Sequence, residues 1–170
     1  MPFRPIHINE ELLFDFFLTF PRFEYALKAC NFFQRLSPKS NECYKPPDAK
    51  PDWNRFASSL RGAFRADKND ELWQACEYIL DSPPCRQVII NDEVACETPI
   101  RPEHESDIEF LLRMIRCFRN NLFHGGEHSN LEVYEDTERK ERFLSSALII
   151  LKECLALTPC VKHEFDQAAI

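Results

Sequence analysis

A long helical pattern covers residues 103–126, with the sequence EHESDIEFLLRMIRCFRNNLFHGG. At about 100° per residue, its large apolar side chains gather on one side of a helix and define a buried face. That face consists of Ile108, Leu111, Leu112, Ile115, Phe118 and Leu122. Gly125 and Gly126 suit the left-handed backbone position that follows a helix. The pattern therefore predicts a helix that is buried on one side and ends at about His124.

Apolar residues recur at helical spacing in further segments, which predict the other helices of a bundle. These segments are residues 9–34, 52–65, about 70–82 and 137–157, with Asp52, Asn69 or Asp70, and Asp136 or Thr137 as candidate N-caps. Residues 86–98 instead form two β-branched runs around Asn91-Asp92, which predict a hairpin. The sequence thus predicts a mainly α fold in one domain over residues 1–170: a bundle of about five helices with a small inserted β-hairpin.

Prolines and aromatic residues add detail to this bundle. Pro21 is expected to kink the first helix or split it, and the proline-rich residues 36–51 are expected to form a loop. The tail after Pro159 is expected to be peripheral, while Trp53 and Trp73 are expected in the core. A second apolar stripe on the first helix makes a homodimer an expectation, because both sides of that helix then need a partner. This stripe consists of Phe14, Leu18, Tyr25 and Phe32.

Composition limits the classes of function. The chain has 170 residues and a net charge of −7, which argues against a generally basic nucleic-acid coat and leaves room for a local basic patch. It contains no basic, uninterrupted apolar leader and no run long enough to span a membrane, so a cytoplasmic location is expected. The eight cysteines include no CxxC pair and are expected to be reduced thiols. A zinc site built from distant Cys and His residues is the open alternative.

Polar residues of the 103–126 helix form a ridge beside the buried face. The ridge consists of Glu109, Arg113, Arg116, Asn120 and His124. Arg119 lies at the edge of the apolar face, where its guanidinium needs a partner, and Glu24 of the first helix is the candidate.

This ridge has the chemistry to act on a phosphodiester. Arginines bind phosphate oxygens bidentately and stabilise the charge that builds up on them without a metal. The imidazole of His124 titrates near neutral pH, so it can transfer a proton to or from a ribose hydroxyl. Asn120, one turn earlier, can orient that ring or hold a phosphate oxygen.

Two segments resemble a known family. Arg119–His124, with the sequence RNNLFH, fits the R-N-x-x-x-H version of the Arg-x4–6-His motif of HEPN domains, many of which are metal-independent endoribonucleases. Phe23–Lys28, as FEYALK on an opening helix, and Phe118–Gly126, as FRNNLFHGG, are similar to uncharacterised bacterial HEPN-type proteins. The resemblance covers most of the chain and agrees with a helical bundle that carries the motif on a late helix.

The resemblance implies roles for the matching positions. Arg119 and His124 would be the catalytic pair and Asn120 the supporting polar residue, while Arg113 and Arg116 of the ridge, outside the motif, are candidate ligands for RNA. In such nucleases two protomers bring their motifs together, and the ribose 2′-OH attacks the adjacent phosphate without a metal or cofactor. A toxin or phage-defence role, with an antitoxin or regulatory partner, is also implied.

Other interpretations are open. Arg119 can serve only to fix helix packing through Glu24, and His124 can serve as a C-terminal helix cap. Arg113 and Arg116 can be solvated or paired with Glu109. The chain would then be a non-catalytic HEPN-like module that binds a nucleotide, RNA or protein, or a dimerisation or antitoxin-like protein.

Overall fold

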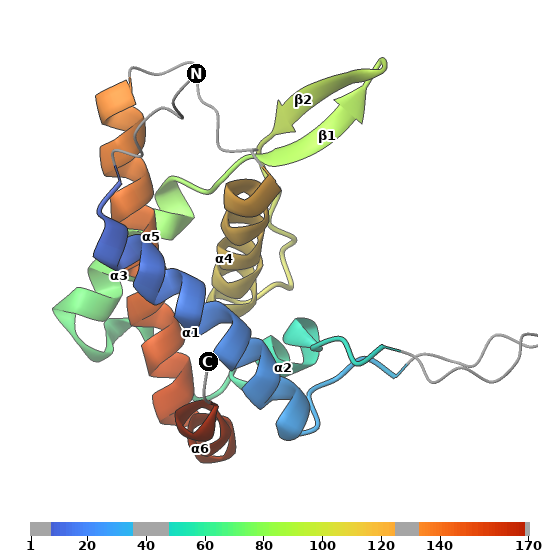
Figure 1. Cartoon of the computed structure of the whole chain (residues 1–170), viewed down its shortest axis with the longest axis vertical. Helices are drawn as coiled ribbons and strands as arrows, with labels where there is room; N and C mark the ends of the chain where they lie inside the picture. Colours follow the sequence, from blue (N-terminus) through green and yellow to red (C-terminus); the bar gives the residue numbers. More distant parts are fainter. Residues whose placement is uncertain (1–7, 36–47, 125–132, 169–170) are drawn as a thin grey trace, which may run out of the picture.

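The protein is a mainly helical bundle from which a small antiparallel hairpin projects (Figure 1). The computed structural model describes residues 8–35, 48–124 and 133–168, without the side chains of 124 and 133–136. Its elements in chain order are α1 (Glu10–Ala29), α2 (Trp53–Ser59), the 3₁₀ turn η1 (Ala66–Lys68), α3 (Asp70–Asp81), β1 (Arg86–Ile90), β2 (Glu93–Glu97), α4 (Asp107–His124), α5 (Val133–Leu157) and α6 (Pro159–Gln167). The predicted fold class is confirmed, with six α-helices within the described residues.

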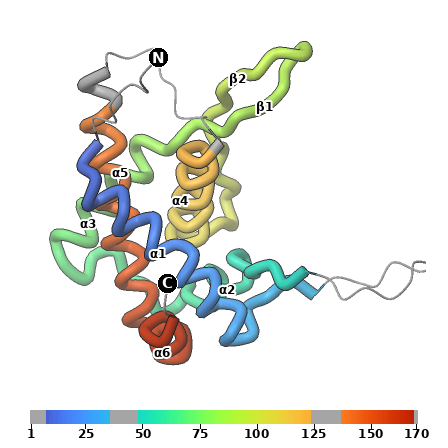
Figure 2. Tube along the Cα trace, viewed as in Figure 1, coloured from blue at the N-terminus to red at the C-terminus, as the bar shows by residue number. Residues whose placement is uncertain are grey.

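Helix α1 crosses the front of the bundle as one uninterrupted element (Figures 1 and 2). It begins at Asn9, whose side chain accepts a hydrogen bond from the backbone N–H of Leu12 at 3.1 Å. Of the two outcomes expected at Pro21, a kink or a split, the split is wrong, because the helix continues past Pro21 to Ala29. Phe20 and Phe23 on either side of Pro21 are fully buried, so packing outweighs the missing N–H.

The predicted caps of α2 and α3 are present. The Asp52 carboxylate accepts from the Arg55 N–H at 3.0 Å, and the Asn69 side chain accepts from the Leu72 N–H at 2.8 Å. The placement of both tryptophans in the core was only half right. Trp53 is buried, whereas Trp73 is 50% exposed because it lies on the outer side of α3.

Aromatic rings join the helices in the core. Phe118 of α4 stacks on Phe143 of α5 at 4.2 Å between ring centroids and meets Phe16 of α1 edge-on at 6.5 Å. At the other end of α1, the Phe23 ring stacks on Trp53 at 5.3 Å. The Phe118 contacts hold α4 against α1 and α5, and α4 also packs against α2, which together set the position of its polar ridge.

The C-terminal segment belongs to the bundle, so the prediction of a peripheral tail is wrong. Residues after Thr158 form α6, which packs against α1 below the bundle (Figure 1). Val161 is buried, and the Phe165 carbonyl accepts a hydrogen bond from Arg22 Nη2 at 2.9 Å. Pro159, which suggested a break, is instead the first residue of α6, where its missing N–H is harmless.

The hairpin extends away from the bundle beside the C-terminal end of α4 (Figures 1 and 2). Its strands pair from Arg86 with Glu97 to Ile90 with Glu93. Asn91 and Asp92 form the turn with φ values of 53° and 64°, as their sequence predicts. Most hairpin side chains are exposed, so it adds little to the core.

The expectation of reduced thiols is wrong for four cysteines. Disulfides join Cys30 to Cys160 and Cys85 to Cys96, with Cα separations of 6.3 Å and 5.6 Å. The first links the end of α1 to α6 across 130 residues of sequence, and the second closes the base of the hairpin. Local spacing did not reveal these pairs because the fold brings the partners together.

No single helix among the described residues is long and apolar enough to cross a bilayer. Residues 137–157 of α5 and α6 pass such a test as a pair, but they are bent by 115° at their junction.

Candidate functional site

Helix α4 carries the candidate site, and Glu109, three residues after the N-cap Ser106, fixes its start. The Glu109 carboxylate accepts from the backbone N–H of Ser106 at 3.0 Å and from its hydroxyl at 2.7 Å. The same carboxylate accepts from the Ser58 hydroxyl at 2.7 Å and pairs with Arg61 Nη2 at 2.7 Å, both near the end of α2. Hydrogen bonding from Arg61, above all, lowers the pKa of Glu109 to about 2. Glu109 therefore stays ionised and holds α4 against α2.

Arg113 pairs with Glu105, so the alternative in which it pairs with Glu109 is wrong. Its Nε and Nη2 donate to the two carboxylate oxygens of Glu105 at 2.8 Å and 2.7 Å. Nη2 also donates to the Ile100 carbonyl at 3.0 Å. Because this bidentate pair occupies most of its donors and neutralises its charge, Arg113 is the weaker of the two predicted RNA ligands.

Arg116, unlike Arg113, has a guanidinium whose charge is not neutralised by a neighbouring carboxylate of the described residues. Its half-buried guanidinium donates to Asn54 Oδ1 at the long distance of 3.5 Å. Within the part of the chain that the structure describes, no carboxylate lies at ion-pair distance from Arg116. The predicted alternative of a pair with Glu109 is therefore wrong for Arg116 as well. Burial lowers the pKa of the Arg116 guanidinium, although the more distant carboxylates of Glu24 and Asp52 act in the opposite direction.

Arg119 lies among aromatic rings and pairs with the predicted partner. Its Nη2 is 4.0 Å from Glu24 Oε2, and its Nη1 donates to Asn120 Oδ1 at 3.0 Å. The guanidinium carbon lies 5.2 Å from the centroid of the Phe20 ring and 4.9 Å from that of Phe123. Its Nε is buried, and none of the described residues accepts a hydrogen bond from it. One long ion pair, one hydrogen bond and two aromatic rings thus hold the guanidinium in place.

Glu24 is itself oriented from α2. Its Oε1 accepts from the indole N–H of Trp53 at 3.2 Å, and this leaves Oε2 to face Arg119. The network Trp53–Glu24–Arg119 connects the N-terminus of α2, the middle of α1 and the last turns of α4. The role of Trp53 was missed in the sequence because a buried tryptophan resembles any other core residue.

Two neighbouring pockets surround these side chains. The first, here called the motif pocket, measures about 220 Å³ and lies between α1, α4 and the chain before α2. Its lining residues are Phe20, Glu24, Gln34, Lys50, Pro51, Trp53, Arg116, Arg119 and Asn120. The second, here called the α2 pocket, measures about 280 Å³ and is bounded by α2, α4 and residues 102–105. Lys50, Gln34 and Asn54 carried no signal in the sequence, since they enter the site only through the fold.

His124 is the last residue of α4, one helical turn after Asn120. Its side chain lies outside what the structure describes, as do Gly125 and Gly126. That His124 and Arg119 form a catalytic pair therefore stays a prediction. Helical geometry places positions 120 and 124 on the same side of α4.

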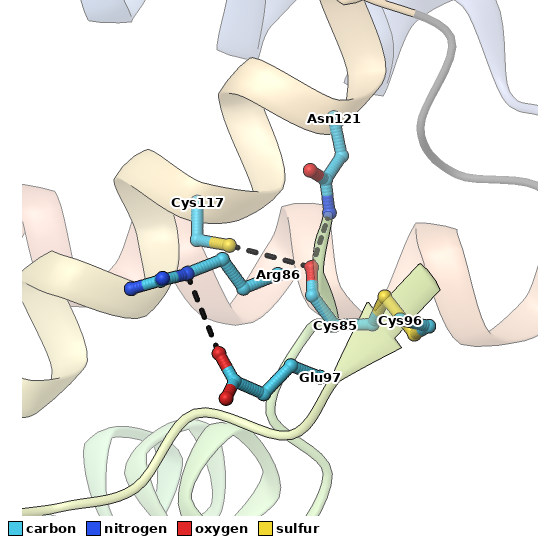
Figure 3. Close-up of a disulfide and its surroundings, with 6 residues drawn as sticks. All are labelled: Cys85, Arg86, Cys96, Glu97, Cys117 and Asn121. Carbon is cyan, nitrogen blue, oxygen red and sulfur yellow. Dashed lines mark hydrogen bonds and ion pairs between the residues drawn. A yellow bond between two sulfur atoms is a disulfide. The ribbon is translucent and has the colours of Figure 1, made fainter. Parts of the chain in front are cut away.

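Asn121 and Cys117 attach the last turns of α4 to the hairpin (Figure 3). Asn121 Nδ2 and Cys117 Sγ both donate to the Cys85 carbonyl, at 2.7 Å and 3.4 Å. Cys85 is held in turn by its disulfide with Cys96, next to the Arg86–Glu97 ion pair of 3.6 Å. Asn121 thus anchors the helix end through a contact with the hairpin that the sequence did not indicate.

No family model matches the chain, and no significant match was found among curated proteins or solved structures. The residues and their geometry alone must support a function. Among the described residues, no cluster of three or more His, Cys, Asp or Glu side chains is arranged to hold a metal ion. What the described residues bring together is a set of arginines and amides around two pockets, a combination that suits an anionic ligand.

Proposed function

We propose that the protein is a metal-independent endoribonuclease of the HEPN type. The observation that carries this proposal is the motif pocket, where Arg116, Arg119 and Asn120 converge beside the helix end that contains His124. Three of the pocket side chains are cationic, Lys50, Arg116 and Arg119, against the single carboxylate of Glu24. A phosphodiester is the ligand that best matches a pocket with this balance of charge.

Each motif residue has a step in the proposed reaction. The ribose 2′-OH attacks the neighbouring phosphorus, the bond to the 5′-oxygen of the next nucleotide breaks, and a 2′,3′-cyclic phosphate forms. Arg119 binds the non-bridging oxygens and stabilises their charge in the transition state. His124 transfers the proton between the 2′-OH and the leaving oxygen, and Asn120 orients it or a phosphate oxygen.

Glu24 acts in this scheme as a positioning residue. Its carboxylate lies 4.0 Å from the Arg119 guanidinium, which is too long for a tight ion pair. The attraction still restricts the positions that the guanidinium can adopt. The rings of Phe20 and Phe123 confine the same group from its faces. An arginine held in this way can bind phosphate with little loss of side-chain entropy.

An exposed aromatic patch beside Arg119 supports the homodimer. Phe14 is 62% exposed on α1, and the rings of Phe17 and Phe123, both also exposed, lie 4.4 Å apart. Contiguous exposed rings of this kind typically mark an interface. Since Phe123 also stacks on Arg119, a second copy docked here would bring two motifs together.

The cellular role follows from the proposed substrate. An RNA-cleaving toxin or phage-defence effector in the cytoplasm needs an antitoxin or regulatory partner to restrain it. Thiols are kept reduced in that compartment, so the Cys30–Cys160 and Cys85–Cys96 pairs would be dithiols there. Cleavage is therefore expected to persist in a reducing buffer.

The test is RNA cleavage by the purified protein in EDTA. The wild type is expected to leave 2′,3′-cyclic phosphate ends, and His124→Ala is expected to lower the rate by about 100-fold or more. His163→Ala, an exposed histidine of α6, is the matched control and should cleave normally. Equal cleavage by His124→Ala, or cleavage only with added metal, would contradict the proposal.

A second candidate is a non-catalytic module that binds RNA or a nucleotide through the same arginines. The packing of Arg119 between Glu24 and two rings favours it, because this packing also suits a purely structural arginine. Binding of RNA without cleavage, unchanged by His124→Ala, would select this candidate.

A further inference from the structure

The motif pocket and the α2 pocket have two lining residues in common. Trp53 and Arg116 line both, so these two side chains form the partition between them. Trp53 is buried and held by Glu24, whereas the long contact with Asn54 is the only hydrogen bond of Arg116 among the described residues. The guanidinium of Arg116 is thus the charged group that lines both pockets.

The other cations of the α2 pocket are already neutralised. Arg61 pairs with Glu109 at 2.7 Å, and Arg113 pairs with Glu105 at 2.7 Å. Of the described arginines that line this pocket, Arg116 is the one without a carboxylate at ion-pair distance. A half-buried cation without a counter-ion attracts an anion strongly, because its dehydration is already part of the folded state.

The rest of the α2 pocket suits a nucleotide. Its floor includes the buried side chains of Ala57 and Leu112, while Asn54 and His104 present an amide and an imidazole. Its volume of about 280 Å³ is near the lower end of small-molecule sites, which suits one nucleotide and excludes a duplex.

We infer that the α2 pocket binds the RNA nucleotide next to the cleaved bond, with Arg116 bound to the phosphate that passes between the two pockets. The position of this nucleotide next to a cleaved bond rests on the proposed function. The binding of a nucleotide in the α2 pocket depends only on Arg116 and the two pockets.

The first test measures binding of a 2′-O-methyl RNA oligonucleotide, which lacks the attacking hydroxyl, by fluorescence anisotropy at several salt concentrations. Arg116→Ala is expected to weaken binding by about tenfold and to lower the slope of log K against log salt by about 0.7, the value for one phosphate contact on a single strand. Arg65→Ala is the matched control, because Arg65 is exposed and pairs with Asp67 away from both pockets. A merely structural role for Arg116 would not change the salt slope.

The second test reports which pocket is occupied. His104 lines the α2 pocket and is absent from the lining of the motif pocket. A nucleoside monophosphate is expected to shift the imidazole resonances of His104, assigned with His104→Gln, whereas inorganic phosphate is expected to leave them unchanged. Unshifted His104 resonances at saturating nucleotide would overturn the assignment of this pocket.

The outcomes separate this inference from the proposed function. Arg116-dependent binding without any RNA cleavage would leave the inferred site standing and refute the nuclease. Cleavage of RNA together with an Arg116→Ala affinity and salt slope equal to those of Arg65→Ala would refute the site and leave the nuclease standing. Absence of binding by the wild type would refute the inferred site.

Discussion

Replacing Glu109 with Gln removes the charge that holds the motif helix against α2. The folded pKa of Glu109 is about 2, against an ordinary value of 4.5, because Arg61 and two serines donate to its carboxylate. Taken in full, this difference corresponds to about 3 kcal/mol of folding stability. Arg61 is 51% exposed and Glu109 13%, so solvent screening reduces the expected loss to about 1–2 kcal/mol at pH 7.

The sign of the pH dependence follows from the lowered pKa. The contribution of Glu109 is fully present above pH 4.5 and is lost as the pH falls from 4.5 towards 2. Glu109→Gln should therefore unfold at lower urea than the wild type at pH 7, and the two should converge near pH 2. The assay is urea unfolding followed by far-UV circular dichroism at a series of pH values.

Asp67→Asn is the matched control for this experiment. The Asp67 carboxylate also pairs with an arginine, at 3.2 Å from Arg65 Nε, but both side chains are largely exposed. Its removal should leave the unfolding midpoint at pH 7 unchanged. A difference between wild type and Glu109→Gln that stayed constant from pH 7 to pH 2 would refute the assigned role of the carboxylate.

Three further predictions concern the fold. Phe118→Ala, at a ring that is 2% exposed and stacked on Phe143, should lower the free energy of unfolding in urea by about 3–5 kcal/mol; a loss below 1 kcal/mol would contradict its place in the core. Pro21→Ala restores a helical N–H donor on an exposed position of α1 and should raise that free energy by about 1–3 kcal/mol, and a lowered value would show that the ring has a structural role. Burial raises the pKa of the Cys76 thiol to about 12 and raises that of Cys154 as well, so neither should react with iodoacetamide at pH 8 until urea is added; mass spectrometry of native protein labelled at either site would be the contrary result.

The fold was largely predictable because its signals are local. Apolar spacing located α1 to α5, the caps Asp52 and Asn69 were read from residue type, and Asn91-Asp92 marked the hairpin turn. The errors arose where tertiary packing decided the outcome. Phe20 and Phe23 keep α1 whole across Pro21, and the buried Val161 holds the short α6, which begins at a proline, in the bundle.

The site was predictable only along one helix. Spacing on α4 placed Arg116 and Asn120 on one ridge, and the need of Arg119, at the edge of the apolar face, for a partner pointed to Glu24. Arg113 pairs with Glu105 because of the path that the chain takes into α4, and helical spacing does not predict that path. For the same reason Lys50, Asn54 and the two disulfides became visible only in the folded chain.

The most direct test of the proposed chemistry compares two substrates in EDTA. One is an RNA oligonucleotide in which the cleavage site has been mapped, and the other carries a single 2′-deoxyribose on the 5′ side of that bond. The wild type should cut the RNA and leave a 2′,3′-cyclic phosphate, and it should leave the deoxy-substituted bond intact. Equal cleavage of both substrates, or no cleavage of either, would contradict the assignment of Arg119 and His124 to metal-independent attack by the ribose hydroxyl.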